Sequence, residues 1–238
     1  MKKTIYKGDE RGFTNHGWLK SYHTFSFANY YEESKCGFGK LLVFNDDTVQ
    51  PDSGFGTHAH DNMEIISIPL MGTLAHKDSF GNDYVINKGD IQVMSAGTGL
   101  THAEFNPSNE ESLHFLQIWI LPDKPNIDPR YQQQHFNFDY DIFVPVITPE
   151  ELYGSMSIYQ DAYLYLGKFK KNKSFGYKLS NPDHGVFVFI IDGRINVKDE
   201  LLHKNDAIGL EELSNININF LENTDILLLE IPMETVDF

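Results

Sequence analysis

The chain has 238 residues, of which 41% are hydrophobic and 13% aromatic, enough for one large domain or two smaller ones with buried cores. Its formal charge of −15 argues against binding to nucleic acid or to anionic lipid, because both need a basic surface. No apolar run approaches the roughly 20 residues of a membrane span. Cys36 is the single cysteine and MKKTIYKGDERG has no signal-peptide character, so we expect a cytoplasmic protein without disulfides.

Strand patterns dominate the sequence. Short runs of β-branched and aromatic residues, separated by Gly, Asn, Asp and Pro, are typical of a β-sandwich or barrel. In chain order they occupy residues 40–49, 63–72, 83–89, 90–97 and 113–122. After a loop-like region at 122–139, the segment TPEE predicts a helix start, with Thr148 as the cap, Pro149 at the first position and Glu151 closing a capping box.

The second half of the chain repeats the first in weaker form. PLMGTLAHKDS leads to NKGDIQVMS in the first half, and VFVFIIDGRINVKDE leads to HKNDAIGLEE in the second. Both read as strand, glycine turn, strand, and a Lys-x-Asp turn into another strand. We therefore expect two domains of similar fold, residues 1–140 and 141–238.

Two clusters of candidate metal ligands occur in the first half. His58 and His60 share one face of an extended strand, because residues i and i+2 point the same way, and Glu64 shares that face if the pleat continues. His102 and Glu104 repeat this spacing in SAGTGLTHAEFN. Three imidazoles and one carboxylate suit Fe, Ni, Mn, Cu or Zn.

The second half lacks this set. When the glycine turns are aligned, Leu179 and Asn181 fall opposite His58 and His60. When the Lys-x-Asp turns are aligned, Ile218 and Phe220 fall opposite the second cluster. The sequence thus predicts a metal site in the first domain and none in the second.

The order of these motifs resembles the cupin superfamily, and more closely the pirin family with its bacterial members that have quercetin dioxygenase activity. DERGFTNHGWLKSYHTFSFANYY is similar to the pirin N-terminal signature. THAHDNMEIISIPLMGTLAHKDSFGN, NKGDIQVMSAGTGLTHAEFN and HFLQIWILP resemble the core blocks. The resemblance is dense over residues 9–135, and the remainder resembles a degenerate second cupin.

The resemblance implies an all-β bicupin, with two stacked double-stranded β-helix (jelly-roll) barrels, a few short helices and one divalent metal in the N-terminal barrel. The family's ligands carry over onto His58, His60, His102 and Glu104, with iron favoured. The implied activity is the opening of the flavonol ring of quercetin-like substrates by O2. Glu64 is interpreted as a group behind the ligands, with direct contact to the metal in some states as the alternative, and Glu64 or Glu104 as the acceptor of the substrate's hydroxyl proton.

Two other functions fit the same resemblance. One is a non-enzymatic regulator that binds a partner protein, with the oxidation state of the metal as its switch. The other is a different cupin chemistry, such as another oxygenase, an isomerase or a hydrolase, since fold does not fix reaction. A deep apolar cavity favours the enzyme, and a flat apolar patch beside a closed metal site favours the regulator.

Several further residues receive weaker interpretations. Phe105 and Trp119 are candidates for an aromatic-substrate pocket. His114 either faces the barrel interior beside the metal or is a hydrogen-bonded core histidine, whereas His76 is expected in a solvated hairpin. Nothing in the spacing connects His23 with the metal ligands.

Overall fold

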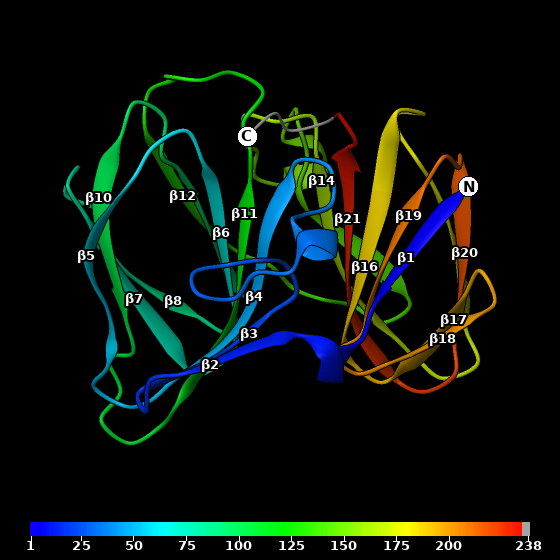
Figure 1. The fold of residues 1–238 in the computed structure, drawn as a ribbon, viewed down its shortest axis with the longest axis horizontal. Helices are drawn as coiled ribbons and strands as arrows, with labels where there is room; N and C mark the ends of the chain where they lie inside the picture. The colour runs from blue at the N-terminus through cyan, green and yellow to red at the C-terminus, as the bar shows by residue number, and fades with distance from the viewer. Residues whose placement is uncertain (235–238) are drawn as a thin grey trace.

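Four antiparallel β-sheets form two barrels that lie side by side in the computed structural model, which describes residues 1–234 (Figure 1). The expected all-β architecture of two stacked barrels is confirmed. In the N-terminal barrel, a seven-stranded sheet of order β12-β9-β6-β11-β4-β3-β2 faces a four-stranded sheet of order β5-β10-β7-β8. Its strands are β2 (Gly12–Asn15), β3 (Leu19–His23), β4 (Leu41–Val49), β5 (Gly54–His60), β6 (Glu64–Met71), β7 (Thr73–Asp78), β8 (Asp83–Asn87), β9 (Asp90–Ser95), β10 (Leu100–Phe105), β11 (Leu113–Ile120) and β12 (Arg130–His135).

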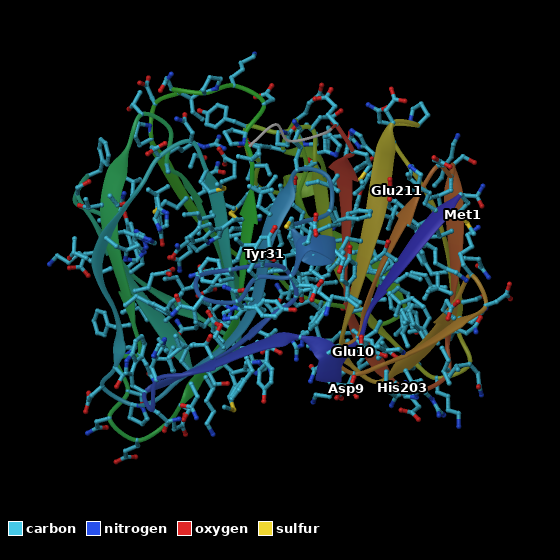
Figure 2. The ribbon with its side chains drawn as sticks, viewed as in Figure 1. Met1, Asp9, Glu10, Tyr31, His203 and Glu211 are labelled. Atoms are coloured by element: carbon cyan, nitrogen blue, oxygen red, sulfur yellow. The ribbon has the colours of Figure 1, made fainter. Side chains whose placement is uncertain are left out.

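The C-terminal barrel repeats this plan with a six-stranded sheet of order β1-β19-β16-β21-β14-β13 and a four-stranded sheet of order β15-β20-β17-β18. Its strands are β1 (Lys2–Tyr6), β13 (Ile142–Ile147), β14 (Tyr163–Phe169), β15 (Ser174–Lys178), β16 (His184–Asp192), β17 (Arg194–Val197), β18 (Glu200–His203), β19 (Ala207–Glu211), β20 (Asn215–Phe220) and β21 (Thr224–Pro232). Side chains fill both barrels (Figure 2). Among the described residues, no helix is long and apolar enough to cross a membrane.

The first strand of the chain lies in the second barrel. β1 pairs antiparallel with β19, with Lys2 opposite Glu211, and Figure 2 shows Met1 beside Glu211 at the outer edge. Tyr6 then enters the core between the barrels, where its ring lies 5.3 Å from that of Phe25 and 5.8 Å from that of Phe187. Residues 2–6 therefore pack with the C-terminal domain, although the sequence placed them in the first.

The predicted internal repeat has matching turns in the two barrels. Gly72 follows β6 and Gly193 follows β16, and both have a positive φ, 77° and 95°, which favours glycine. Asp90 accepts a hydrogen bond from a backbone N–H three residues earlier, and Asp206 does the same in the second barrel. The two hairpins are thus closed by the same local interactions.

The segment predicted to begin a helix forms a tight turn instead. Thr148 Oγ1 accepts a hydrogen bond from the backbone N–H of Leu152 at 2.7 Å, as a capping residue would. Glu151, however, has a left-handed φ of 54°, which stops an α-helix from propagating, and only the 3-10 turn Leu152–Gly154 follows. The other short helices are the 3-10 turns Gly8–Glu10 and Glu33–Lys35.

The two barrels share an apolar core between their large sheets. Phe44 on β4 packs its ring 5.2 Å from Phe187 and 4.8 Å from Phe189, both on β16. Ile66 and Ile118 belong to the same cluster of buried residues. One face of the seven-stranded sheet is therefore committed to the second barrel, and the opposite face lines the interior of the first.

Candidate metal centre

Three imidazoles converge inside the N-terminal barrel. β5 and β10 pair antiparallel with His102 directly opposite His58, and His60 lies two residues further along β5 on the same face. The Nε2 atoms of His58 and His102 are 3.0 Å apart, and one ring nitrogen of each of the three histidines lies within 4.8 Å of the others. The alternation of side chains predicted that His58 and His60 share a face, and the pairing of β5 with β10 brings His102 to them.

The imidazoles are held in a state that can accept a metal ion. His58 Nδ1 lies 2.8 Å from the carbonyl oxygen of Gly56, which places its proton there and leaves Nε2 as a lone-pair donor. Burial, and then the neighbouring His58, lower the pKa of His60 to about 4 and that of His102 to about 2. Both rings are therefore neutral at pH 7. His60 Nε2 and His102 Nδ1 are buried without a hydrogen-bond partner among the described residues.

Glu104 is fully buried, and it groups with His76 and His102 rather than with His58 and His60. Its Oε1 accepts hydrogen bonds from Ser67 Oγ at 3.0 Å and Gln92 Nε2 at 3.5 Å, and its Oε2 accepts one from Gln117 Nε2 at 3.1 Å. Burial raises the pKa of this carboxyl above its usual value. These three polar side chains come from β6, β9 and β11, and they hold the carboxylate beside His102.

His76 is a member of this buried group that the sequence interpretation missed. It was expected in solvent, but β7 pairs with β10 and places it directly opposite Glu104. It is fully buried, and one donor atom each from His76, His102 and Glu104 lie within 4.8 Å of one another. His76 Nε2 is 3.3 Å from Asp78 Oδ2. Its shared parity with the core residue Leu74 was the available signal.

Glu64 lies away from the imidazoles. The chain leaves β5, passes Asn62 with a positive φ of 45° and enters β6 in the opposite sheet, so the pleat of β5 does not continue. Glu64 has the parity of Ile66, which packs between the barrels, and its Oε2 accepts a hydrogen bond from Ser95. The expectation that Glu64 shares a face with His58 is wrong.

The three candidate pocket residues separate in the structure. Trp119 lies beside the imidazoles, with its ring 4.9 Å from that of His60. Phe105 is 43% exposed, because β10 turns it away from the face that carries His102. His114 shares the parity of residues packed between the barrels, and its Nε2 lies 2.5 Å from Asp46 Oδ1 in a separate cleft.

A cleft of about 380 Å³ opens beside His58 and His60, a volume in the range of small-molecule sites. One side is aromatic and apolar, and includes Phe27 and Trp119. The other is a polar wall from β2, β3, β4 and β11. This polar wall consists of Thr14, Ser21, His23, Asn45, Asp47 and Gln117.

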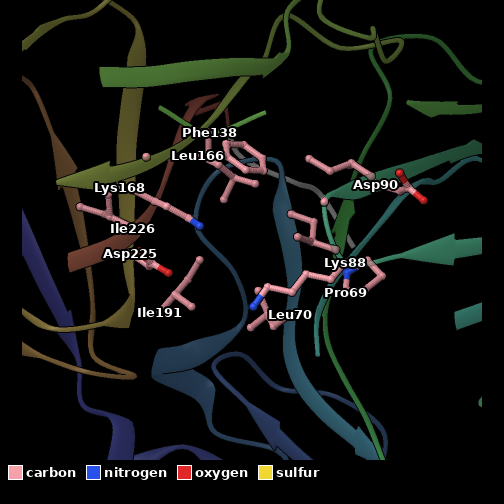
Figure 3. A pocket seen from close by; sticks show the side chains of 14 residues that line it. Pro69, Leu70, Lys88, Asp90, Phe138, Leu166, Lys168, Ile191, Asp225 and Ile226 are labelled. Atoms are coloured by element: carbon pink, nitrogen blue, oxygen red, sulfur yellow. The ribbon is translucent and has the colours of Figure 1, made fainter. Parts of the chain in front are cut away.

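A second cavity of about 270 Å³ lies between the barrels (Figure 3). Leu70, Phe138 and Leu166 form much of its lining, with Lys88 and Lys168 also present. None of the described residues that line it is a histidine or cysteine. The cleft at the imidazoles is therefore the better candidate for a metal-assisted reaction.

In comparisons with known proteins, a separate family model matches each barrel. The family model Pirin matches residues 7–120, and the model of the quercetinase C-terminal cupin domain matches residues 145–231. The chain is 38% identical over 228 residues to the quercetin 2,3-dioxygenase of Escherichia coli K12, covering 96% of this chain and 98% of that protein. It is also 36% identical to a putative quercetin 2,3-dioxygenase of Pasteurella multocida, covering 90% and 92% of the two chains.

Two solved structures share the whole fold. The crystal structure of YhhW from Escherichia coli superposes with a TM-score of 0.95 at 37% identity, covering 99% of this chain and 100% of that chain. The structure of bacterial pirin YhhW in complex with nickel(II) gives 0.94 at 37% identity, covering 98% and 100%.

Proposed function

Because the chain belongs to the pirin family of the cupin superfamily, we propose that it is a metal-dependent dioxygenase that opens the ring of quercetin-like flavonols with O2. It is quercetin 2,3-dioxygenase-like over nearly its whole length. The observation that carries the proposal is the convergence of three imidazoles, two of which line a cleft with an aromatic side. A cleft of this kind favours a small-molecule enzyme over a regulator that docks a protein on a flat patch.

The residues present fit a divalent transition metal. One cation between the three rings would separate His58 Nε2 from His102 Nε2, which lie 3.0 Å apart, and would give the unpartnered Nε2 of His60 a partner. We propose His58, His60, His102 and Glu104 as its ligands. This donor set accepts Fe, Ni, Mn, Cu or Zn, and the nickel(II) complex of the Escherichia coli relative is consistent with that range.

The chain's own residues define what happens around the metal. The bound metal would supply a Lewis acid that stabilises the ionised hydroxyl of the flavonol and favours its reaction with O2. Trp119 and Phe27 present aromatic faces to a planar substrate, and the polar wall offers hydrogen-bond partners to its hydroxyl groups. Gln117 belongs to that wall and also donates to Glu104, so it connects substrate binding with ligand position.

Oxygen uptake with quercetin tests the proposal. Protein reconstituted separately with Fe, Ni, Mn and Cu is compared with His102→Ala, which loses one ligand. We expect turnover with at least one metal and none with the variant. Fully metallated protein that consumes no O2 with quercetin would refute the flavonol activity, and a panel of other substrate classes on the same sample would test the other cupin chemistries.

A further inference from the structure

The proposed reaction needs an acceptor for the substrate's hydroxyl proton, and neither carboxylate predicted for that task faces the cleft. Glu64 points toward Ser95 on the far face of the sheet. Glu104 is fully buried, is a proposed ligand, and has both oxygens engaged by Ser67, Gln92 and Gln117. Neither residue lines the cleft.

Asp47 is the only carboxylate among the described residues that line the cleft. It lies on β4 with Asn45 two residues before it on the same face. Ser21 Oγ donates a hydrogen bond to Asp47 Oδ1, and Oδ2 has no hydrogen-bond partner within residues 1–234. The neighbouring Asp46 points the other way, where it pairs with Arg11.

The surroundings of Asp47 favour uptake of a proton. No cationic side chain forms an ion pair with it in the described part of the chain, whereas the negative charges of Asp46 and Glu104 are both close enough to disfavour its ionised form. Burial is the largest effect and raises the pKa of Asp47 to about 7, against the opposing hydrogen bond from Ser21. A base with this pKa is well matched to proton transfer near neutral pH.

We propose that Asp47 accepts the hydroxyl proton of the substrate bound in the cleft, an inference that rests on the proposed function. The substrate's O–H bond breaks, a new O–H bond forms at Asp47 Oδ2, and the electron pair remains on the substrate oxygen. The role requires the side chain to touch that hydroxyl, which its position in the polar wall allows.

Hydrogen-bonded groups lead from Asp47 toward the outer part of the cleft. Ser21 Oγ lies 3.3 Å from His23 Nδ1, and His23 Nε2 lies 3.1 Å from Thr14 Oγ1. Burial lowers the pKa of His23, so its ring is neutral at pH 7; Nδ1 donates to Asn45 Oδ1 at 2.8 Å, which leaves Nε2 to accept from Thr14. This row of side chains holds the carboxyl of Asp47 in place on the polar wall.

Ionisation of bound quercetin can be measured apart from turnover. Protein loaded with Zn²⁺, which does not change oxidation state, is titrated with quercetin, and the red-shifted absorption of the flavonol anion is recorded at pH 7.5, where Asp47 is mostly ionised before the substrate binds. Asp47→Asn is compared with Asp90→Asn, which removes a carboxylate that pairs with His135 outside the cleft. Quercetin methylated at the 3-hydroxyl, which has no proton to give there, serves as the control ligand.

We expect Asp47→Asn to bind quercetin with a Kd within about threefold of wild type, but to lose most of the anion band and about 100-fold in kcat in the oxygen-uptake assay. Asp90→Asn should match wild type, and the methylated ligand should bind wild type and Asp47→Asn equally. An unchanged anion band and kcat in Asp47→Asn would overturn the proposal.

A second variant covers the case in which Asp47→Asn does not fold. Ser21→Ala keeps the carboxylate but removes the hydrogen bond that lowers its pKa, so formation of the anion band should move to higher pH. An unmoved titration would overturn the role of Asp47. Absence of O2 uptake by every metallated wild-type sample would instead refute the proposed function, while the zinc titration judges Asp47 separately.

Discussion

The two barrels share one strand plan but have opposite interiors. In β10 the inward side chains are Leu100, His102 and Glu104, and at the same spacing in β20 they are Ile216, Ile218 and Phe220. Phe220 stacks on Phe169 with ring centroids 4.0 Å apart, and this apolar cluster fills the second barrel.

Buried polar groups sharpen the difference. Four groups donate hydrogen bonds to Glu230 in the second barrel: Tyr177, His184 and the backbone N–H groups of Ser180 and Asn181. In the first barrel, His60, His102 and Gln92 each keep a buried atom without a partner in the described part of the chain. Buried polar groups are normally satisfied, so the gathering of several unpartnered atoms around the imidazoles favours a ligand there. The second barrel is built for stability and the first for binding.

Removing a proposed ligand histidine should have the largest effect, because it removes metal binding from the first barrel. His102→Ala should lower metal affinity by at least about 100-fold, because even residues behind a metal ligand contribute 10–100-fold. Metal content after dialysis against a chelator measures the loss. His203→Ala, an exposed histidine of the second barrel, is the control and should retain one metal per chain. Equal loss in both variants would contradict the assignment.

Truncating a core side chain of the second barrel should lower the free energy of unfolding and leave metal binding unchanged. Ile218→Ala should reduce the free energy of unfolding by about 2–5 kcal/mol, and Ile218→Val by about 0.5–1.5 kcal/mol, because fully buried contacts are lost. Urea unfolding and metal analysis of the same samples measure both properties. A change in metal content of the folded Ile218→Val protein would show that the barrels are not independent in this respect.

Two buried carboxyls should respond to pH in opposite directions. The pKa of Asp47 is raised from 3.8 to about 7, so its ionisation destabilises the fold as pH rises through that window. The free energy of unfolding of metal-free Asp47→Asn should therefore rise relative to that of wild type by at most about 1.4 kcal/mol per pH unit. Burial alone would raise the pKa of Glu230, but its hydrogen bonds, from His184 first, lower it below 4.5. Glu230→Gln should therefore lower the free energy of unfolding most above pH 5, and by progressively less as pH falls below 4.5.

Urea unfolding of metal-free protein between pH 3 and 8 compares the two variants. Both substitutions remove one buried carboxyl, so each serves as the control for the other. If the free energies of unfolding of Asp47→Asn and Glu230→Gln, relative to wild type, changed with pH in the same way, the two carboxyls would not differ as described.

The smallest expected effect concerns a single hydrogen bond. Ser67→Ala removes the donor to Glu104 Oε1 and should lower metal affinity about 10-fold, measured by competition with a chelator. Ser95→Ala removes an equivalent donor to Glu64 on the other face of the sheet and should leave the affinity unchanged. An equal drop in both variants would show that Glu64 also acts on the metal.

Strand patterns predicted an all-β barrel or sandwich and the two ligand pairs, and the family resemblance added the bicupin fold and the meeting of the pairs at one site. His58 with His60, and His102 with Glu104, need only the two-residue period of a strand. Contacts between strands were less accessible, because they depend on which strands pair. The pairing of β7 with β10 buries His76, and the passage from β5 to β6 between sheets turns Glu64 away.

The polar wall was missed for the same reason. Asp47 stands beside Asp46 in a strand that reads as apolar and then acidic, and only the packing of β3 and β4 shows which of the two faces the cleft. The alternation within β4 gives the two carboxylates opposite faces, but it does not say which face is the interior.

The location of bound metal tests the central claim most directly. A crystal of the metallated protein, measured by anomalous diffraction at the metal edge, should show one metal per chain in the N-terminal barrel, with nitrogen ligands of His58, His60 and His102 at about 2.0–2.1 Å for zinc. Metal bound in the second barrel, or a fully metallated protein with no metal at these imidazoles, would contradict the account.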